Sequence, residues 1–176
     1  MCLRYQIDDI QARLESLLTL PVCLVSRAAD MRMFHFGRLR RTEKETRGEI
    51  ALHVQCPWRI DHLGTIVTGF MDLWDPASNM ASDRSNWNYD DGNRQDECIQ
   101  RLFGAGEQDT SRVTVVSQPD QWVVTAVESL TNGQARLELS IDYELLLFPA
   151  GSTSEHWRLF KIGAREPHFV VGGNDK

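Results

Sequence analysis

The chain of 176 residues carries a formal net charge of −6, with 41% hydrophobic residues and four cysteines. This length predicts a single domain over residues 1–176. The acidic balance excludes a general nucleic-acid binder, which needs a basic face. No apolar run approaches the length that crosses a bilayer, and the first residues lack a signal-peptide cleavage site, so we expect no membrane partner and no signal peptide.

The cysteines indicate a reducing compartment. They occupy positions 2, 23, 56 and 98, with no CxxC pair and no regular spacing. Without a secretion signal, such cysteines are typical of reduced thiols. We therefore expect a cytoplasmic protein.

A helix is predicted over residues 7–20. Its apolar residues recur at spacings of three and four, which places them on one face: Ile7, Ile10, Leu14, Leu17 and Leu18. Asp8 and Gln11 have the spacing of a capping box, and Pro21 ends the helix.

The pattern then changes to period two, which predicts strands. In the first half of the chain the predicted strands are 22–28, 31–37, 49–57 and 65–73. A charged loop separates the second from the third, and a turn near residues 61–64 separates the third from the fourth. Sequential strands of this kind indicate an antiparallel meander.

A polar stretch, residues 74–93, has almost no periodicity and is too long for a simple connection. Asn93 is then placed to cap a short helix that ends at Phe103, with Gly104 as its C-terminal stop.

The remaining chain is again predicted to be β-structure, at 112–117, 121–130, 134–141, 143–148, 155–162 and 167–171. Asn132-Gly133 is the clearest hairpin signal in the chain. The predicted fold is α+β: a bent antiparallel β-sheet or partial barrel with two helices packed against it.

Two histidines are the first candidate for chemistry. If strand 31–37 pairs with 49–57, His35 and His53 lie on the face opposite Phe34 and Leu52, close enough for a shared metal. The next strand offers no third ligand at that level, so the expectation is two polar-face histidines without metal.

The acidic residues of 83–97 resemble a calcium loop at Asn86, Asn88, Asp90 and Glu97. Asp91 occupies the position that requires glycine, and no entering helix precedes the loop. A solvated loop is the preferred interpretation. No metal, cofactor or catalytic residue is predicted anywhere in the chain.

The run Cys56-Pro57-Trp58-Arg59 raises the question of a reactive thiol. Cys56 alternates in phase with Val54, so it is expected to face the core, and Pro57 to end strand pairing. Trp58 and Trp157 either fill the core, with Arg59 and Arg158 paired to carboxylates outside, or form an exposed interface patch.

The segments ALHVQCPWRI, DLWDP and LFPAGSTSEHWRLF, with HFVV near the end, resemble an uncharacterised family of small single-domain bacterial proteins. The likeness extends over residues 51–171. It implies a bacterial, stand-alone protein and transfers no activity, ligand or functional residue.

The leading functional hypothesis is a non-enzymatic module that binds another protein, for example an immunity-type protein that neutralises a toxin. The alternative is a small-molecule-binding protein or enzyme that uses the concave face of the sheet. A homodimer that joins the basic residues 38–47 to the acidic residues 83–97 is compatible with both. The candidate binding residues are His35, His53, Gln55, Arg59, Asp90, Asp91 and Arg158.

Overall fold

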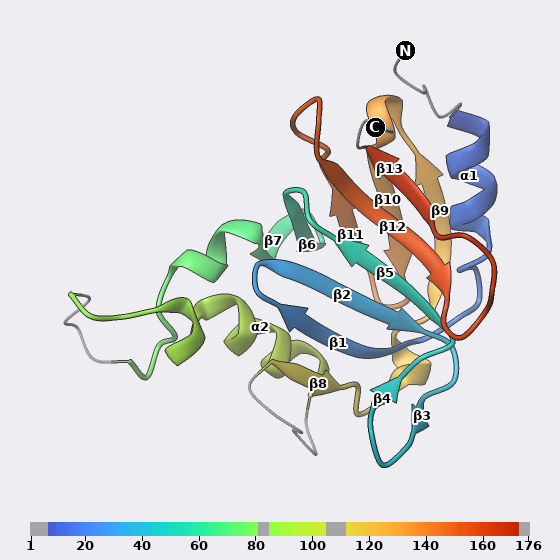
Figure 1. Ribbon diagram of the computed structural model, residues 1–176. Helices are drawn as coiled ribbons and strands as arrows, with labels where there is room; N and C mark the ends of the chain where they lie inside the picture. Colours follow the sequence, from blue (N-terminus) through green and yellow to red (C-terminus); the bar gives the residue numbers. More distant parts are fainter. Residues whose placement is uncertain (1–6, 81–84, 105–111, 173–176) are drawn as a thin grey trace.

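The computed structural model describes residues 7–80, 85–104 and 112–172. Two antiparallel sheets dominate it, and neither closes into a barrel in the part of the chain described (Figure 1). The predicted α+β class, with its bent antiparallel sheet structure and two helices, is confirmed.

The six-stranded sheet has the order β13-β12-β5-β2-β1-β8. Its strands are β1 (Val22–Ala28), β2 (Met31–Phe36), β5 (Ile50–Val54), β8 (Val113–Val115), β12 (Glu155–Lys161) and β13 (Phe169–Gly172). The five-stranded sheet has the order β7-β6-β11-β10-β9. Its strands are β6 (Trp58–His62), β7 (Thr65–Gly69), β9 (Val124–Ser129), β10 (Ala135–Leu139) and β11 (Tyr143–Leu147). A small hairpin of β3 (Arg40–Arg41) and β4 (Thr46–Arg47) projects beside them.

The two large sheets pack face to face because alternate residues of each are apolar. The shared core contains Phe34, Leu52 and Trp157 from one sheet and Trp58 and Leu137 from the other, each at most 2% exposed. Phe34 and Trp58 meet across the core in an edge-to-face contact, with ring centroids 5.6 Å apart. Each sheet therefore has one buried face and one outer face.

The two helices close the sides of this sandwich. Helix α1 (Ile7–Glu15) packs along β9, where Gln11 Oε1 accepts from the Ser129 N–H at 2.7 Å. Helix α2 (Arg94–Phe103) packs near β7, β8 and the 3-10 turn Phe70–Trp74. As predicted, Asn93 caps α2 and accepts from the Asp96 N–H at 2.7 Å.

Three local predictions need correction. Helix α1 ends at Glu15, before the predicted 20, because the N–H groups of residues 16–18 donate to the third residue back and the Thr19 N–H donates to the Val124 carbonyl. Gln11 bonds to β9 and Glu15 rather than forming the expected capping box with Asp8. The predicted strand 65–73 ends at Gly69, and its last residues belong to the 3-10 turn.

A strand that the sequence did not predict begins directly after Pro57. The chain leaves the six-stranded sheet at Val54, crosses at Gln55–Pro57, and enters the other sheet as β6. The His156 carbonyl accepts from both the Gln55 and Cys56 N–H groups at this crossing. Cys56-Pro57 is thus the connection between the two sheets.

Candidate functional site

The structure separates the candidate binding residues into three places. Four of them lie on or beside the outer face of the six-stranded sheet: His35, His53, Gln55 and Arg158. Arg59 lies on the outer face of the five-stranded sheet, opposite Leu146. Asp90 and Asp91 belong to a 3-10 turn in the polar stretch, Tyr89–Asp91.

The histidine pair is confirmed as lying on the face opposite Phe34 and Leu52. His35 is opposite Ala51 and His53 is opposite Met33, so they are offset along the strands. Burial, aided by the charge of His53, lowers the pKa of His35 to about 4, and the Gly48 N–H donates to its Nδ1 at 3.2 Å. Among the residues that the structure describes, no three His, Cys, Asp or Glu side chains are grouped to hold a metal.

His53 belongs to a chain of contacts along this outer face. Its ring meets Phe160 edge to face at 4.8 Å, and His168 stacks on Phe160 at 3.9 Å. Burial and the nearby Arg158 lower the pKa of His53 to about 4. Arg158 pairs with Glu155, which also accepts from Gln55. The charges of Arg158 and Glu155 thus neutralise each other on this face.

Two acidic residues of 83–97, Asp90 and Asp96, pair with arginines, of which Arg27 and Arg32 are buried. Arg27 Nη2 and Arg32 Nη2 approach the Asp96 carboxylate at 2.9 and 2.7 Å. Asp90 bridges Arg27 and Arg112, each at 3.1 Å. Although burial alone would raise the pKa of Asp96, the two guanidinium groups lower it. Hence these carboxylates fix the loop and α2 to the sandwich.

Cys56 is 2% exposed, as its alternation predicts. Burial raises its pKa to about 11, which keeps the thiol protonated at neutral pH. Trp58 and Trp157 are also in the core, and their neighbouring arginines pair outside with Asp61 and Glu155. The structural alternative for both Trp-Arg pairs is confirmed.

The most unusual local structure lies at one end of the five-stranded sheet, in residues that the sequence did not single out. Two hairpin turns meet there, and the Leu63 N–H donates to the Asp142 carbonyl at 3.4 Å. Leu63, Ile141 and Asp142 all have positive φ, at 49°, 63° and 62°. This left-handed conformation is unfavourable for aliphatic residues and most of all for β-branched isoleucine.

Both aliphatic side chains at these turns project into solvent. Leu63 is 73% exposed and Ile141 is 50% exposed. Two-residue hairpin turns with positive φ favour Asn-Gly, yet Leu63-Gly64 occupies one here. Neither backbone preference nor burial explains the choice of these residues.

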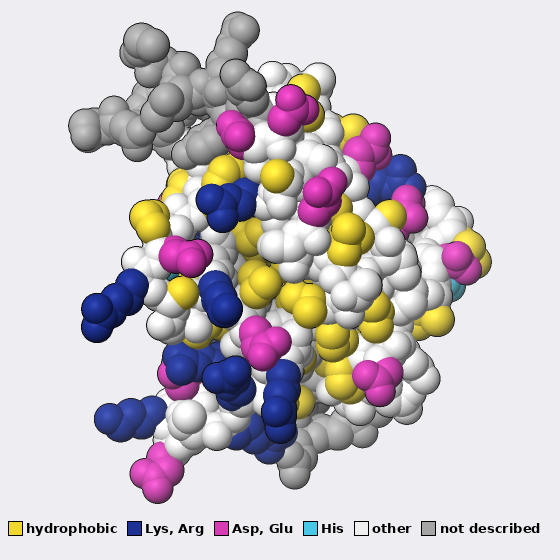
Figure 2. Space-filling model, turned by 90° about the vertical axis from the view of Figure 1, so that its right-hand side faces the viewer, with side chains coloured by type: hydrophobic (Ala, Val, Ile, Leu, Met, Phe, Trp, Pro, Cys, Tyr) yellow, Lys and Arg dark blue, Asp and Glu magenta, His cyan; other side chains and the backbone are white. Residues whose placement is uncertain are grey.

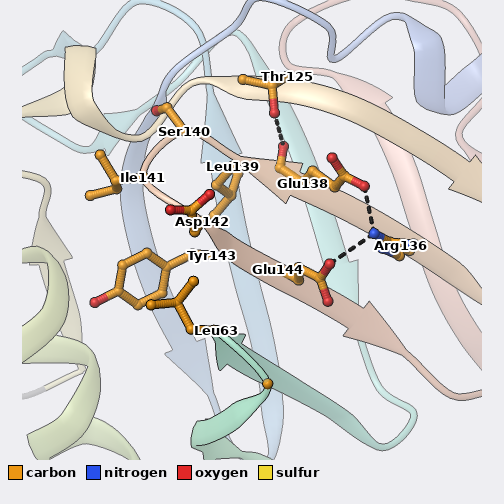
Figure 3. Close-up of a pocket in the computed structure, with 11 residues that line it drawn as sticks. Leu63, Thr125, Arg136, Glu138, Leu139, Ser140, Ile141, Asp142, Tyr143 and Glu144 are labelled. Atoms are coloured by element: carbon orange, nitrogen blue, oxygen red, sulfur yellow. Dashed lines mark hydrogen bonds and ion pairs between the residues drawn. The ribbon is translucent and has the colours of Figure 1, made fainter.

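A row of carboxylates runs across the same outer face. Glu138 on β10 is opposite Glu144 on β11, which is opposite Asp61 on β6. Opposed side chains on adjacent strands lie ~5 Å apart at Cβ, and like charges in such pairs are destabilising. Arg136 approaches Glu138 at 2.6 Å and Glu144 at 2.8 Å, which offsets part of this repulsion (Figure 3).

These turns and carboxylates border a cavity of about 620 Å³. In Figure 3, Glu138 and Glu144 reach toward Arg136 on one side, while Leu63, Ile141 and Tyr143 lie on the other. Asp61, opposite Glu144, is 7% exposed, and its Oδ1 has no hydrogen-bond partner among the described residues. We call this region the twin-turn surface; it comprises Asp61, Leu63, Glu128, Arg136, Glu138, Ile141, Asp142 and Glu144.

A second cavity, of about 400 Å³, lies on the same sheet near β7. Arg59 stacks over the Phe148 ring at its wall, 5.1 Å from the centroid, and the strongly exposed Ile66 and Met71 also line it. The linings of four cavities on the described chain can be compared with the candidate binding residues. Arg59 lines this second cavity, and the other three cavities are lined by none of the candidates. None of these four cavities brings several of the candidate binding residues together.

The sequence alone did not predict the twin-turn surface, because the pairing of distant strands brings its residues together. Alternation places Arg136, Glu138 and Glu144 outward, but only the register brings the carboxylates of three strands into one row. A signal did exist at Leu63, an aliphatic residue in the turn predicted near residues 61–64, where Asn, Asp or Gly is usual. The sequence predicts Ile141 as the last residue of strand 134–141, but β10 ends at Leu139 and Ile141 belongs to the turn that follows.

No helix in the described residues has both the length and the apolar character needed to cross a membrane. Comparison with family models, with curated proteins and with solved structures finds no match to this chain.

Proposed function

We propose that the chain is a protein-binding module whose twin-turn surface docks a basic partner. The observation that carries the proposal is the concentration of locally unfavourable features at one place. Leu63 and Ile141 combine left-handed backbone with solvent exposure, beside a row of three facing carboxylates. Departures from folding preferences of this kind cluster at functional sites.

The chemistry of the surface indicates the partner. The surface and its margin carry five carboxylates but only two guanidinium groups among the described residues, those of Arg59 and Arg136. The carboxylates belong to Asp61, Glu128, Glu138, Asp142 and Glu144. The local balance is therefore negative, as is that of the whole chain. Exposed aliphatic side chains beside such a surface provide apolar contact, while the carboxylates attract and orient lysine and arginine.

We therefore favour a partner that presents basic side chains next to an apolar patch. An immunity-type protein that neutralises a basic toxin is one form of this proposal. Cytoplasmic location and membership of the bacterial family that the sequence resembles are parts of the same proposal. The fully protonated, buried Cys56 takes no part in it.

The test uses a photo-crosslinking amino acid in place of Ile141, with Asn132 as the matched control position. Both positions are exposed and have positive φ, at 63° and 62°, but Asn132 lies in the β9–β10 hairpin turn. In lysate of the source cells we expect a discrete adduct at position 141 and none at 132.

The captured protein is then purified and titrated by calorimetry. The proposal expects it to be basic, to bind the wild-type chain, and to bind E138Q/E144Q at least ~10-fold more weakly, a difference of about 1.4 kcal/mol. Equal affinity for both chains, or equal crosslinking at both positions, would contradict the proposal.

A further inference from the structure

The β3–β4 hairpin gives this acidic chain a separate basic surface. Residues 38–47 contain Arg38, Arg40, Arg41, Lys44 and Arg47 against two glutamates. Lys and Arg side chains gather at the lower left of Figure 2, the level at which Figure 1 places β3 and β4. Arg38, Arg40 and Lys44 are all exposed.

The ion pairs of this hairpin leave it available for further contacts. Arg40 approaches Glu49 at 3.5 Å while remaining 63% exposed, and Arg47 approaches Glu45 at 2.8 Å. Exposed pairs of this kind contribute little to stability. They are therefore readily exchanged for carboxylates of another molecule.

The acidic residues 83–97 are poorly suited to be the partner of this hairpin. Asp90 and Asp96 are held by Arg27, Arg32 and Arg112, none of which belongs to the hairpin. Asp91 Oδ2 accepts from the Asn88 N–H within its own turn. The predicted homodimer through these residues stays a prediction: three guanidinium groups hold two carboxylates there, whereas in the described part of the chain Arg136 alone faces Glu128, Glu138 and Glu144 on the twin-turn surface. Asp83 lies outside the described residues.

We propose that the β3–β4 hairpin of one copy docks on the twin-turn surface of a second copy. The inference rests on the proposed function, because it assigns this chain as one basic ligand of that surface. Arg38 and Lys44 supply cations for Glu138 and Glu144, and Leu39, half-buried beside Arg38, supplies an apolar contact for Ile141. Each copy carries one hairpin and one twin-turn surface, so the contact is head to tail.

The association is weak and salt-dependent. Two or three exposed ion pairs and one apolar contact form a weak interface, for which we expect a Kd on the order of 1 mM. Screening at 0.5 M salt removes most of it. Because self-association covers the twin-turn surface, it competes with the external partner.

The experiment is sedimentation equilibrium of the full chain, at 20 mM and 500 mM salt and up to about 1 mM protein. The hairpin variant is R38E/K44E, and R94E/R101E is its control with the same net charge, altered on α2. The surface variant is E138K/E144K, with E138Q/E144Q as the substitute if that variant does not fold.

We expect the weight-average mass of the wild type and of R94E/R101E to rise with concentration at low salt only. R38E/K44E and E138K/E144K alone remain monomeric, and their equimolar mixture associates because each twin-turn surface again meets a hairpin of opposite charge. With E138Q/E144Q as substitute, the expectation is a monomer alone. A monomeric wild type at 1 mM and low salt, or self-association of R38E/K44E equal to the wild type, overturns the inference. If the wild type is monomeric while position 141 still crosslinks a basic partner, the proposed function survives.

Discussion

The backbone of Ile141 and Asp142 offers a direct test of the twin-turn argument. Replacing the pair by Asn-Gly, in I141N/D142G, supplies residues that adopt positive φ with little cost. Relief of the left-handed isoleucine is worth ~1–2 kcal/mol, and relief at Asp142 adds a smaller amount. Ile141 is 50% exposed, so its removal loses only about half of the ~1.5–3 kcal/mol of a fully buried side chain.

The balance is a gain of about 1 kcal/mol in the free energy of unfolding, or roughly 2–4 °C in Tm for a chain of this size. Urea unfolding and calorimetry measure it. The control is Ile66→Asn on β7, since Ile66 is 60% exposed but is absent from the positions with positive φ. That variant loses ~1 kcal/mol through lost burial and strand preference.

The free energy of unfolding should therefore rise in I141N/D142G and fall in Ile66→Asn, so that the two variants differ by ~2 kcal/mol. If I141N/D142G is destabilised as much as Ile66→Asn, the left-handed turn stores no strain and the reasoning fails. A stabilised variant that also loses binding to the captured partner would link the strain to function.

Three further predictions concern the buried groups. Asp96→Ala removes the carboxylate that Arg32 pairs with and leaves Arg27 paired with Asp90, so it should lower the free energy of unfolding by ~3–5 kcal/mol. Arg101→Ala removes only an exposed pair with Glu97 and should change the free energy of unfolding by less than ~0.5 kcal/mol. Equal losses in urea unfolding would contradict this reasoning. The pKa of His35 lies at about 4, below its ordinary 6.5, so between these values the unfolded chain binds more protons than the folded chain. The contribution of His35 to stability is therefore complete above pH 6.5 and is lost as the pH falls toward 4. His35→Gln should flatten this pH profile in urea unfolding, and identical profiles would refute the argument. Burial raises the pKa of Cys23 to about 12 and that of Cys56 to about 11. Both thiols should therefore react with a thiol reagent at pH 8 at least ~100-fold more slowly in the native chain than in the unfolded chain. Peptide mass spectrometry measures the labelling of each cysteine, and fast labelling of the native chain would contradict their burial.

Much of the sheet structure could be predicted because alternation is a local property. Phe34, Leu52 and Trp157 occupy the core as their phase indicates, and Asn132-Gly133 forms the expected turn between β9 and β10. Strand β6 could not be predicted in this way. It is short, carries Asp61 and follows a proline, so its pairing with β11 depends on residues eighty positions away.

The buried arginines show a second limit of the sequence. Arg27 and Arg32 are 5% and 1% exposed in strands whose other residues are largely apolar. Their burial is possible because the carboxylate of Asp96, on α2, pairs with both guanidinium groups. The periodicity of a strand predicts which of its positions face inward. It does not predict whether the element packed against those positions carries a charge. The candidate site was missed for the same reason, because register between distant strands assembles it.

The crossing at Gln55–Pro57 has a consequence for any reagent raised against this protein. Gln55 bonds to Glu155 at the outer side of one sheet, while Arg59, four residues later, pairs with Asp61 on the outer side of the other. Packed sheets lie ~10 Å apart, so this short segment spans the thickness of the molecule. A linear peptide copied from residues 51–61 would therefore present side chains of two opposite epitopes at once and reproduce neither. Antibodies that recognise the native surfaces should accordingly be selected on the folded chain.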